Sequence, residues 1–170
     1  ARQNGTWSQQ QKLTAPDGIA GDQFGNSVAI SGNIVLGGAW QAGGSNSGAA
    51  YAFTVCEDFG QQQKLVTLNP SQEMYFGSAI AIDGNTAVIG AYHWSNGRGA
   101  AFVFTKLPGN VWIQSQMLTA SNGDNGDDFG NAVAVEGDMI VIGAETDNFS
   151  GQQLRGSIYV FTRNGNTWSE

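Results

Sequence analysis

A segment that carries Phe-Gly near its start and Gly-Ala at its end occurs three times in this chain. The three occurrences span residues 22–39, 74–91 and 127–144, and their Phe-Gly pairs begin at residues 24, 76 and 129. The spacings are therefore 52 and 53 residues. Self-similarity at a fixed period of this length predicts a repeat architecture, in which each unit buries its apolar surface against its neighbours.

Each repeat contains four short segments with the pattern of β-strands, and no segment has the pattern of a helix. The first segment opens on an aromatic residue and is rich in Gln, so we expect it at a sheet edge that faces water. The second follows Phe-Gly, the third is an apolar run that ends in Gly-Ala, and the fourth has aromatic residues at alternate positions. In the first repeat these predicted strands are Trp7–Thr14, Phe24–Ile30, Ile34–Ala39 and Gly48–Thr54.

A glycine lies between the second and third predicted strands of every repeat, which indicates a tight antiparallel hairpin. The three turns read Ser31-Gly-Asn33, Asp83-Gly-Asn85 and Glu136-Gly-Asp138. Four-stranded units at this period are typical of β-propeller blades. We therefore predict an all-β fold of three four-stranded antiparallel blades. The period alone also allows another β-solenoid, but the hairpins favour antiparallel blades.

The chain resembles the FG-GAP repeat family, which includes the propellers of integrin α-subunits. The motifs Trp-x-x-Gln-Gln-Lys-Leu, Asp-x-Phe-Gly-x-x-Val-Ala, Val-Ile-Gly-Ala and Gly-x-Ala-Tyr-Val-Phe-Thr recur in the same order. The resemblance covers nearly all of residues 7–170 and is strongest to the short bacterial-type version of the repeat. It implies one propeller segment over 1–170, with repeats at about 7–55, 59–107 and 112–164 and the start of a fourth at 165–170.

The chain departs from the calcium-binding members of this family at the hairpin turn. Those members carry an Asp-x-Asp-x-Asp-Gly-x-x-Asp loop between the Phe-Gly strand and the Gly-Ala strand. The short turns of this chain offer one carboxylate each, or two in the third repeat. Because Ca²⁺ takes about six to eight oxygen ligands, the resemblance does not extend to the family's calcium site.

Antiparallel connectivity places the long loops of every repeat at one end of the blades and the tight hairpins at the other. Variable loops on a rigid scaffold usually carry binding residues, so this long-loop face is the candidate ligand-binding site. Its rings could stack on a sugar or anchor a partner protein, or they could simply cover the ends of neighbouring blades. The residues concerned are Trp40, Tyr92, His93, Trp94 and Phe149.

Half of the carboxylates, seven of fourteen, lie in the third repeat. Asp124, Asp127 and Asp128 belong to an oxygen-rich loop on the long-loop face, and we consider them candidate Ca²⁺ ligands. The alternative is a solvated acidic loop without metal, and we expect no other cofactor. Asn4 and Asn148 fit the N-glycosylation sequon, which matters if the source is a secreting eukaryote.

The charge of the chain argues against two classes of partner. A net charge of −7 with only seven Lys and Arg residues predicts no binding to nucleic acid or to anionic membranes. No apolar run approaches the roughly 18 residues of a membrane-spanning helix, so we also predict no membrane insertion.

No motif for nucleophilic or metal-assisted catalysis is present in the sequence. We therefore predict a non-catalytic adhesion or assembly module that is extracellular or on the cell surface. The alternative is a glycan-binding, lectin-like propeller domain of a secreted protein or enzyme.

Three blades do not close a ring, because propellers typically have four to eight. We expect either further blades of a longer protein or other copies of the chain as partners. If each sheet takes its fourth strand from the next repeat, the Trp7–Thr14 strand is left over. It could then complete the open third blade of another copy by strand addition. Reciprocal exchange would give a six-bladed ring, and unreciprocated exchange would give a filament.

Overall fold

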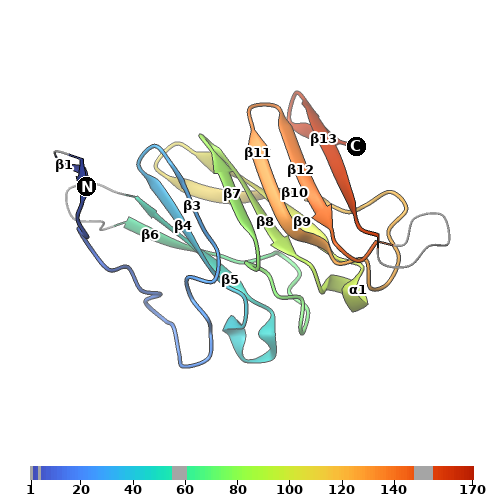
Figure 1. Cartoon of the computed structure of the whole chain (residues 1–170), viewed down its shortest axis with the longest axis horizontal. Coiled ribbons are helices and arrows are strands. Elements are labelled where there is room, and N and C mark those ends of the chain that lie inside the picture. The colour runs from blue at the N-terminus through green and yellow to red at the C-terminus, as the bar shows by residue number, and fades with distance from the viewer. Residues whose placement is uncertain (1, 4, 55–60, 148–154) are drawn as a thin grey trace.

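The computed structural model describes residues 2–3, 5–54, 61–147 and 155–170. Three four-stranded antiparallel sheets stand side by side like the blades of a propeller (Figure 1). The all-β prediction and the predicted three blades are therefore confirmed. The first blade is β3 (Val28–Ser31), β4 (Ile34–Ala39), β5 (Ala49–Thr54) and β6 (Gln61–Leu65).

The other two blades repeat this meander in the same strand order. The second consists of β7 (Ile80–Asp83), β8 (Thr86–Ala91), β9 (Ala100–Leu107) and β10 (Val111–Leu118). The third consists of β11 (Phe129–Glu136), β12 (Met139–Ala144), β13 (Ser157–Asn164) and β14 (Thr167–Ser169). Strands β3, β7 and β11 are the first strands of the three blades, and β7 lies between the other two.

The predicted hairpins form as the turn sequences require. Ser31 pairs with Ile34, Asp83 with Thr86 and Glu136 with Met139. Each loop therefore contains two residues, and the first of them is the glycine. Its φ is +53° to +56°, a backbone conformation that costs free energy for a residue with a Cβ. The predicted Phe-Gly strand starts later than expected in the first two blades, at Val28 and Ile80, whereas in the third blade it starts at Phe129 as predicted.

The fourth strand of each sheet comes from the repeat that follows it. Strand β6 pairs with β5, β10 with β9 and β14 with β13. This arrangement leaves the first Gln-rich segment without a sheet, and the prediction of a strand over Trp7–Thr14 is wrong. Only β2 (Thr6–Trp7) is extended, and it pairs with β1 (Arg2–Gln3) instead. The physical reason is that a strand needs a neighbour for its backbone hydrogen bonds.

Two hydrophobic cores lie between the blades, and each strand divides its side chains between them because they alternate in direction. Phe102 and Phe104 of β9 face the first blade, whereas Ala101 and Val103 face the third. The Phe of each Phe-Gly pair packs edge-on against the first ring of the fourth-segment strand. These ring pairs are Phe24–Tyr51, Phe76–Phe102 and Phe129–Tyr159, with centroids 5.3–5.5 Å apart.

A third, smaller core covers the outer side of the first blade. Tyr51 and Phe53 are buried there beneath Phe24, Leu13 and Ala15. Leu13 is the counterpart of Leu65 and Leu118, which pack into the two cores between blades. The segment before the first blade therefore keeps the packing of a fourth strand although it has no sheet to join.

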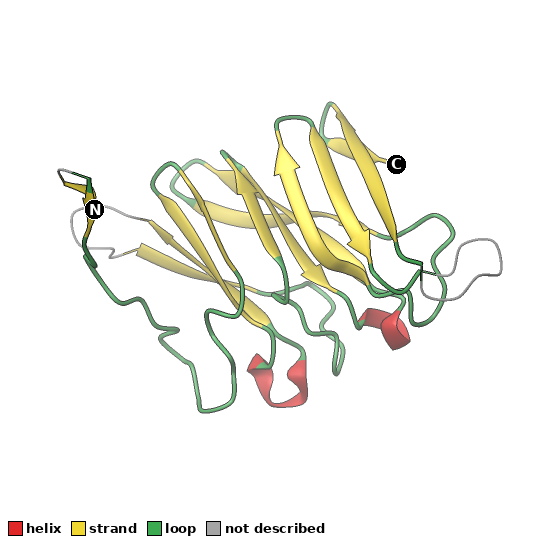
Figure 2. Cartoon of the chain, viewed as in Figure 1, coloured by secondary structure: helices red, strands yellow, loops and turns green. Residues whose placement is uncertain are grey.

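The two ends of the blades differ as the sequence predicts. Figure 2 shows the hairpin turns along one end and the long loops along the other. The loops contain two single helical turns, η1 (Ala42–Asn46) and α1 (Trp94–Gly97), whose interiors include left-handed residues. No helix in the described residues is long and apolar enough to cross a membrane.

Candidate functional site

A pocket of about 360 Å³ opens on the long-loop face where all three blades contribute. Two positions of the repeat line it in all three blades. One is the second residue after Phe, and the other is the residue after Gly-Ala. The first position supplies short polar side chains and the second supplies two rings and a carboxylate. The lining residues are Asn26, Ser78, Asn131, Trp40, Tyr92 and Glu145.

Aromatic side chains gather beside this pocket at the junction of the first and second blades. The Tyr75 ring lies 4.9 Å from the Trp40 ring, 5.5 Å from the Tyr92 ring and 5.2 Å from the His93 ring. We call these four residues the aromatic cluster. Burial raises the pKa of the Tyr92 hydroxyl above its usual range, so the phenol stays protonated and can donate a hydrogen bond at neutral pH.

Tyr75, the central ring of this cluster, was missed by the sequence analysis. It sits at the position before Phe-Gly, where its equivalents are Gln23 and Asp128, and all three have a φ between +54° and +57°. A non-glycine residue rarely adopts this conformation. The shared position before Phe-Gly was the signal that could have placed Tyr75 beside the loops that follow Gly-Ala.

The other predicted ring residues divide into three situations. The His93 ring nitrogen Nδ1 lies 2.8 Å from the carbonyl oxygen of Glu73, which holds the ring against the neighbouring loop. Trp94 packs against the core between the first two blades, so it covers the blade ends. Phe149 lies outside the described residues, as do the sequon residues Asn4 and Asn148.

Among the candidate calcium ligands, Asp127 uses one carboxylate oxygen to close its loop, and its buried Oδ1 has no hydrogen-bond partner among the described residues. Asp127 is buried, and its Oδ2 accepts a hydrogen bond of 2.5 Å from the Asp124 backbone N–H. Asp22 and Met74 are the equivalents of Asp127 in the other repeats. The Asp22 carboxylate accepts a hydrogen bond from the Ile19 N–H, and the Met74 sulfur accepts one from the Ser71 N–H. Because an uncharged Met serves at this position in the second blade, the common role of the position is to close the loop.

Asp128 follows Asp127 in the sequence but has a different hydrogen-bond partner. Its Oδ2 accepts a hydrogen bond from the Thr146 hydroxyl, and burial raises the pKa of its carboxyl group above the usual value. Among the described residues, no three His, Cys, Asp or Glu side chains gather closely enough to hold a metal ion. Ca²⁺ binding by Asp124, Asp127 and Asp128 and the alternative of a solvated acidic loop without metal both stay predictions.

At the hairpin end, the residues that open the turns connect neighbouring blades. The Ser31 hydroxyl accepts a hydrogen bond from the Gly84 N–H, and the Asp83 carboxylate accepts one from the Gly137 N–H. These bonds are 3.0 and 2.7 Å long. The residue that opens each turn therefore holds the turn of the next blade, and Glu136 is its equivalent in the third blade.

Adjacent blades also approach closely at the Gly-Ala pairs. A Cβ on Gly38 would lie 2.1 Å from the Gly77 carbonyl oxygen, and one on Gly90 would lie 2.0 Å from that of Gly130. The Phe-Gly segment of each following blade thus sits directly on the preceding strand. Their equivalent in the third blade is Gly143, where an added Cβ would meet only atoms of the same blade, the nearest at 3.0 Å.

An open surface remains where a fourth blade would pack on the third. A pocket of about 550 Å³ there is lined by Gly143, Gly156 and Ile158, among others. Gly156 is the equivalent of Gly48 and Gly99, whose backbones bridge to Phe76 and Phe129 of the following blades. We call this pocket the Phe-Gly socket, because it is the third-blade equivalent of the surface on which each of the first two blades receives the Phe-Gly segment of the next.

Comparison with known proteins gives a family model but no curated relative. The model described as FG-GAP repeat matches residues 7–53, 59–104 and 112–161, which together make up most of the chain. No curated protein sequence matches the chain. Among solved structures, the chain is similar to the crystal structure of the computationally designed Ika4 protein, at 15% identity and a TM-score of 0.38. That match covers 92% of this chain and 100% of the designed one.

Proposed function

The chain belongs to the FG-GAP repeat family, and from this premise we propose that it is a non-catalytic assembly and adhesion module that completes a propeller ring with a second copy. In this proposal the third blade of each copy receives the first blade of the other. The observation that carries it is the apolar surface of the third blade. The residues of that surface are the equivalents of residues that the first two blades bury against the blade that follows them.

The outward side chains of β13 are exposed where their equivalents are fully buried. Ile158 and Val160 have exposures of 73% and 43%, whereas Ala101 and Val103 of β9 have 0%. Ile158 and Val160 are two residues apart on one strand and therefore share a face, and exposed apolar patches of this type mark interfaces. A following blade would remove this surface from water, as the third blade does for Ala101 and Val103.

The first blade offers the complementary surface. Val28 and Ile30 of β3 are each 70% exposed, whereas their equivalents Ile80 and Ile82 pack toward the first blade. At each interface within the chain, the side of a blade that faces the next blade packs on the side of the next blade that faces back. Ile158 and Val160 lie on the first kind of side, and Val28 and Ile30 lie on the second. A second copy therefore presents the same partner that each blade already has within the chain.

Two specific contacts of the internal interfaces would be reproduced between copies. Glu136 would accept a hydrogen bond from the Gly32 N–H of the second copy, as Asp83 does from Gly137. The Phe24–Gly25 segment of the second copy would enter the Phe-Gly socket, as Phe76–Gly77 does over Gly38 and Gly48. The third blade also has a glycine, Gly143, at the position where Gly38 and Gly90 contact the next blade. No other described residue approaches Gly143 from that side.

Two copies of three blades give six, which lies within the usual range of about four to eight for a closed propeller. Reciprocal packing makes two equal interfaces related by a twofold axis and leaves no open blade. This closure favours the ring over a filament. FG-GAP repeats are typical of extracellular and surface proteins, and the proposed ring would act there by presenting its long-loop face to a protein partner.

Sedimentation equilibrium and multi-angle light scattering test this assembly directly. We expect twice the mass of one chain for the wild type and the mass of one chain for Ile158→Lys, which places a charge in the contact. Leu68→Lys is the matched control, since Leu68 is an equally exposed apolar residue on a loop. A stable folded wild-type monomer would overturn the proposal, and a ladder of larger species would overturn the closed ring.

A second candidate function, glycan binding, is favoured by the pocket on the long-loop face. Carbohydrate sites combine ring faces with short polar side chains, and the pocket places Trp40 and Tyr92 beside Asn26, Ser78 and Asn131. A glycan array probed with the wild type tests it. A hit that is lost in Trp40→Ala and kept in Trp7→Ala, an exposed ring elsewhere, would support a lectin, and no hit would favour assembly alone.

A further inference from the structure

The lining of the pocket on the long-loop face includes a carboxylate, that of Glu145. The other lining residues are the rings of Trp40 and Tyr92 and short polar side chains. Glu145 is exposed, and among the described residues no hydrogen bond or ion pair to its carboxylate is found. Its negative charge is therefore available to a ligand.

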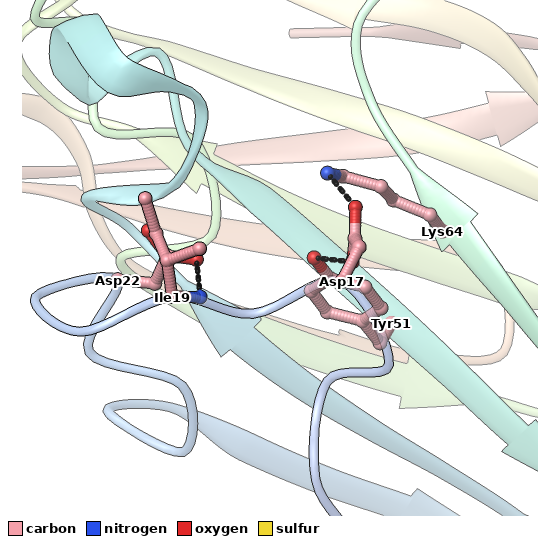
Figure 3. Close-up of polar contacts among 5 residues, drawn as sticks. All are labelled: Asp17, Ile19, Asp22, Tyr51 and Lys64. Atoms are coloured by element: carbon pink, nitrogen blue, oxygen red, sulfur yellow. Dashed lines mark hydrogen bonds and ion pairs between the residues drawn. The ribbon is translucent and has the colours of Figure 1, made fainter.

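The two ion pairs in the described part of the chain contain no residue of this lining. Figure 3 shows the first pair, in which Lys64 Nζ lies 2.6 Å from Asp17 Oδ2 and the Tyr51 hydroxyl donates a 2.7 Å hydrogen bond to Asp17 Oδ1. The second pair joins Arg163 to Asp138. Each of these carboxylates is neutralised by a basic side chain of the protein, whereas the carboxylate of the pocket faces no such cation among the described residues.

The charge of Glu145 acts on neighbouring groups of the long-loop face. Burial raises the pKa of the Tyr92 hydroxyl, and the charge of Glu145 adds to the rise. Burial likewise raises the pKa of the Asp128 carboxyl, and Glu145 again adds to it. Arg155 and Glu145 both line the Phe-Gly socket, but no ion pair joins these two described residues. The negative potential around Glu145 therefore favours a cationic ligand.

The short polar side chains of the pocket offer hydrogen-bond acceptors. Asn26 uses its Nδ2 to donate to the Ser78 carbonyl at 3.1 Å, and its Oδ1 remains as an acceptor. The Ser78 hydroxyl donates to the Gly90 carbonyl at 3.3 Å, so its oxygen can still accept. Asn131 Oδ1 is buried beside them without a partner in the described part of the chain. A ligand that is rich in donors therefore fits this lining.

An amine and sugar hydroxyls together supply such donors. An ammonium group has three N–H donors and no acceptor, and a carboxylate binds it through charge-assisted hydrogen bonds. Hydroxyl groups can donate to the neutral acceptors, and the rings of Trp40 and Tyr92 can stack on the apolar face of a sugar. The pocket volume of about 360 Å³ lies within the range of about 300–1,000 Å³ for small-molecule sites.

We propose that the pocket on the long-loop face binds a glycan that carries a free amine, and that Glu145 selects this amine. The inference rests on glycan binding, the second candidate function above, and names the class of glycan. A lysine side chain of a protein partner would also supply a cation, but it would leave the acceptors of Asn26 and Ser78 without donors. An amino sugar satisfies the charge and the acceptors together.

Two trimers that differ only in acetylation test this selectivity on the intact chain. Isothermal titration calorimetry at pH 6 and low salt compares the β-1,4-linked trimer of glucosamine, whose amines are protonated, with its N-acetylated form, which is neutral. We expect the wild type to bind the amine form at least about threefold more tightly, a ratio typical of an exposed ion pair. The preference should shrink at high salt, because salt screens the charge of the carboxylate.

Glu145→Gln should remove the preference and keep the affinity for the acetylated trimer within about twofold, because the exposed charge is all that changes. Glu136→Gln is the matched control, since it removes the same charge from the hairpin end of the same blade and should keep the preference. Trp40→Ala should weaken the binding of both trimers. Thermal unfolding checks that each variant folds.

Each other outcome identifies which step fails. A wild type without a preference, or a preference that is unchanged in Glu145→Gln, would overturn the selectivity and leave glycan binding standing. Hits on the glycan array without binding of the amine trimer would do the same. A lysine tripeptide that competes as strongly as the glucosamine trimer would overturn the glycan as the source of the amine. No binding of either trimer and no hit on the array would overturn glycan binding and this inference together.

Discussion

The side-chain amide of Gln63 makes two hydrogen bonds to the backbone of Trp112 in the next blade. Its Nε2 donates to the Trp112 carbonyl, and its Oε1 accepts from the Trp112 N–H, both at 2.8 Å. Gln116 holds Trp168 in the same way at 2.7 and 2.8 Å. These amides tie the fourth strands of neighbouring blades together, so the expectation that the Gln residues face water is wrong for Gln63 and Gln116.

Gln63→Ala should therefore destabilise the protein although a Gln-rich edge suggests a tolerant surface. Two hydrogen bonds are lost, and the Trp112 backbone groups lose their partner in a partly buried place, which gives an expected loss of about 1–3 kcal/mol in the free energy of unfolding. Urea unfolding measures it. Gln72→Ala, on an exposed loop, is the control, and an equal effect of the two variants would contradict the tie.

Alanine at the Gly-Ala pairs should distinguish contacts within the chain from contacts between copies. Gly90→Ala places a Cβ 2.0 Å from the Gly130 carbonyl oxygen, and we expect a loss of several kcal/mol or failure to fold, since backbone must move. Gly143→Ala places a Cβ 3.0 Å from Asn131 Oδ1 and 3.3 Å from Ala132 Cβ, both within the third blade. It should fold nearly as well as the wild type, as judged by thermal unfolding at low concentration.

Gly143→Ala should nevertheless prevent dimer formation if the Phe-Gly socket receives a second copy. Light scattering at high concentration measures this, with the wild type as reference. A dimeric Gly143→Ala protein would show that no backbone approaches the socket as closely as Gly77 approaches Gly38.

The Asp17–Lys64 pair makes stability depend on pH in a defined direction. The hydrogen bond from Lys64, followed by that from Tyr51, lowers the pKa of Asp17 in the folded state. A lowered carboxyl pKa contributes stability that is fully present above the unfolded value of about 3.9 and is lost as the pH falls through the folded value. Since both side chains are substantially exposed, we expect a contribution of less than about 1 kcal/mol.

Unfolding of the wild type and Asp17→Asn between pH 2 and 7 checks this dependence. The stability difference between them should be largest at neutral pH and should shrink as the pH falls below about 4. Glu73→Gln removes an exposed carboxylate elsewhere and should show no such change. A difference that grows on acidification would have the wrong sign for this pair.

Calcium titration tests the acidic loop of the third repeat. Because Asp127 Oδ2 already accepts the Asp124 N–H, and Asp128 is bonded to Thr146, we expect neither heat nor a shift in melting temperature when Ca²⁺ is added to chelated protein. Binding that disappears in Asp127→Asn would instead identify the loop as a metal site.

The repeat pattern was sufficient to predict much of the architecture. The hairpin glycines, the apolar runs and the alternating rings each act through local geometry, so their positions carry over to all three blades. The order of the motifs left open which sheet takes each fourth strand, and the structure shows that it is the preceding sheet. The prediction for Trp7–Thr14 was wrong because a strand forms only with a neighbour, and no sheet among the described residues pairs with positions 8–14.

The candidate site was harder to predict because it depends on which loops meet. Trp40 and Tyr92 line one pocket, but Tyr75, whose ring contacts both of theirs, comes from a different loop. Trp94 has the same residue type as Trp40 and lies in the equivalent loop, yet it packs into a core. Ring residues on loops look alike in sequence, and only the packing of neighbouring blades separates the buried ones from the accessible ones.

The sequence by itself therefore determined the blades, because periodicity, turn glycines and side-chain alternation act over a few residues. Tertiary structure alone decided which apolar side chains are covered. Ile158 and Val160 hold the same positions of the repeat as Ala101 and Val103, yet they are 73% and 43% exposed where Ala101 and Val103 are fully buried. Burial and register arise between segments far apart in the chain, so no local pattern encodes them.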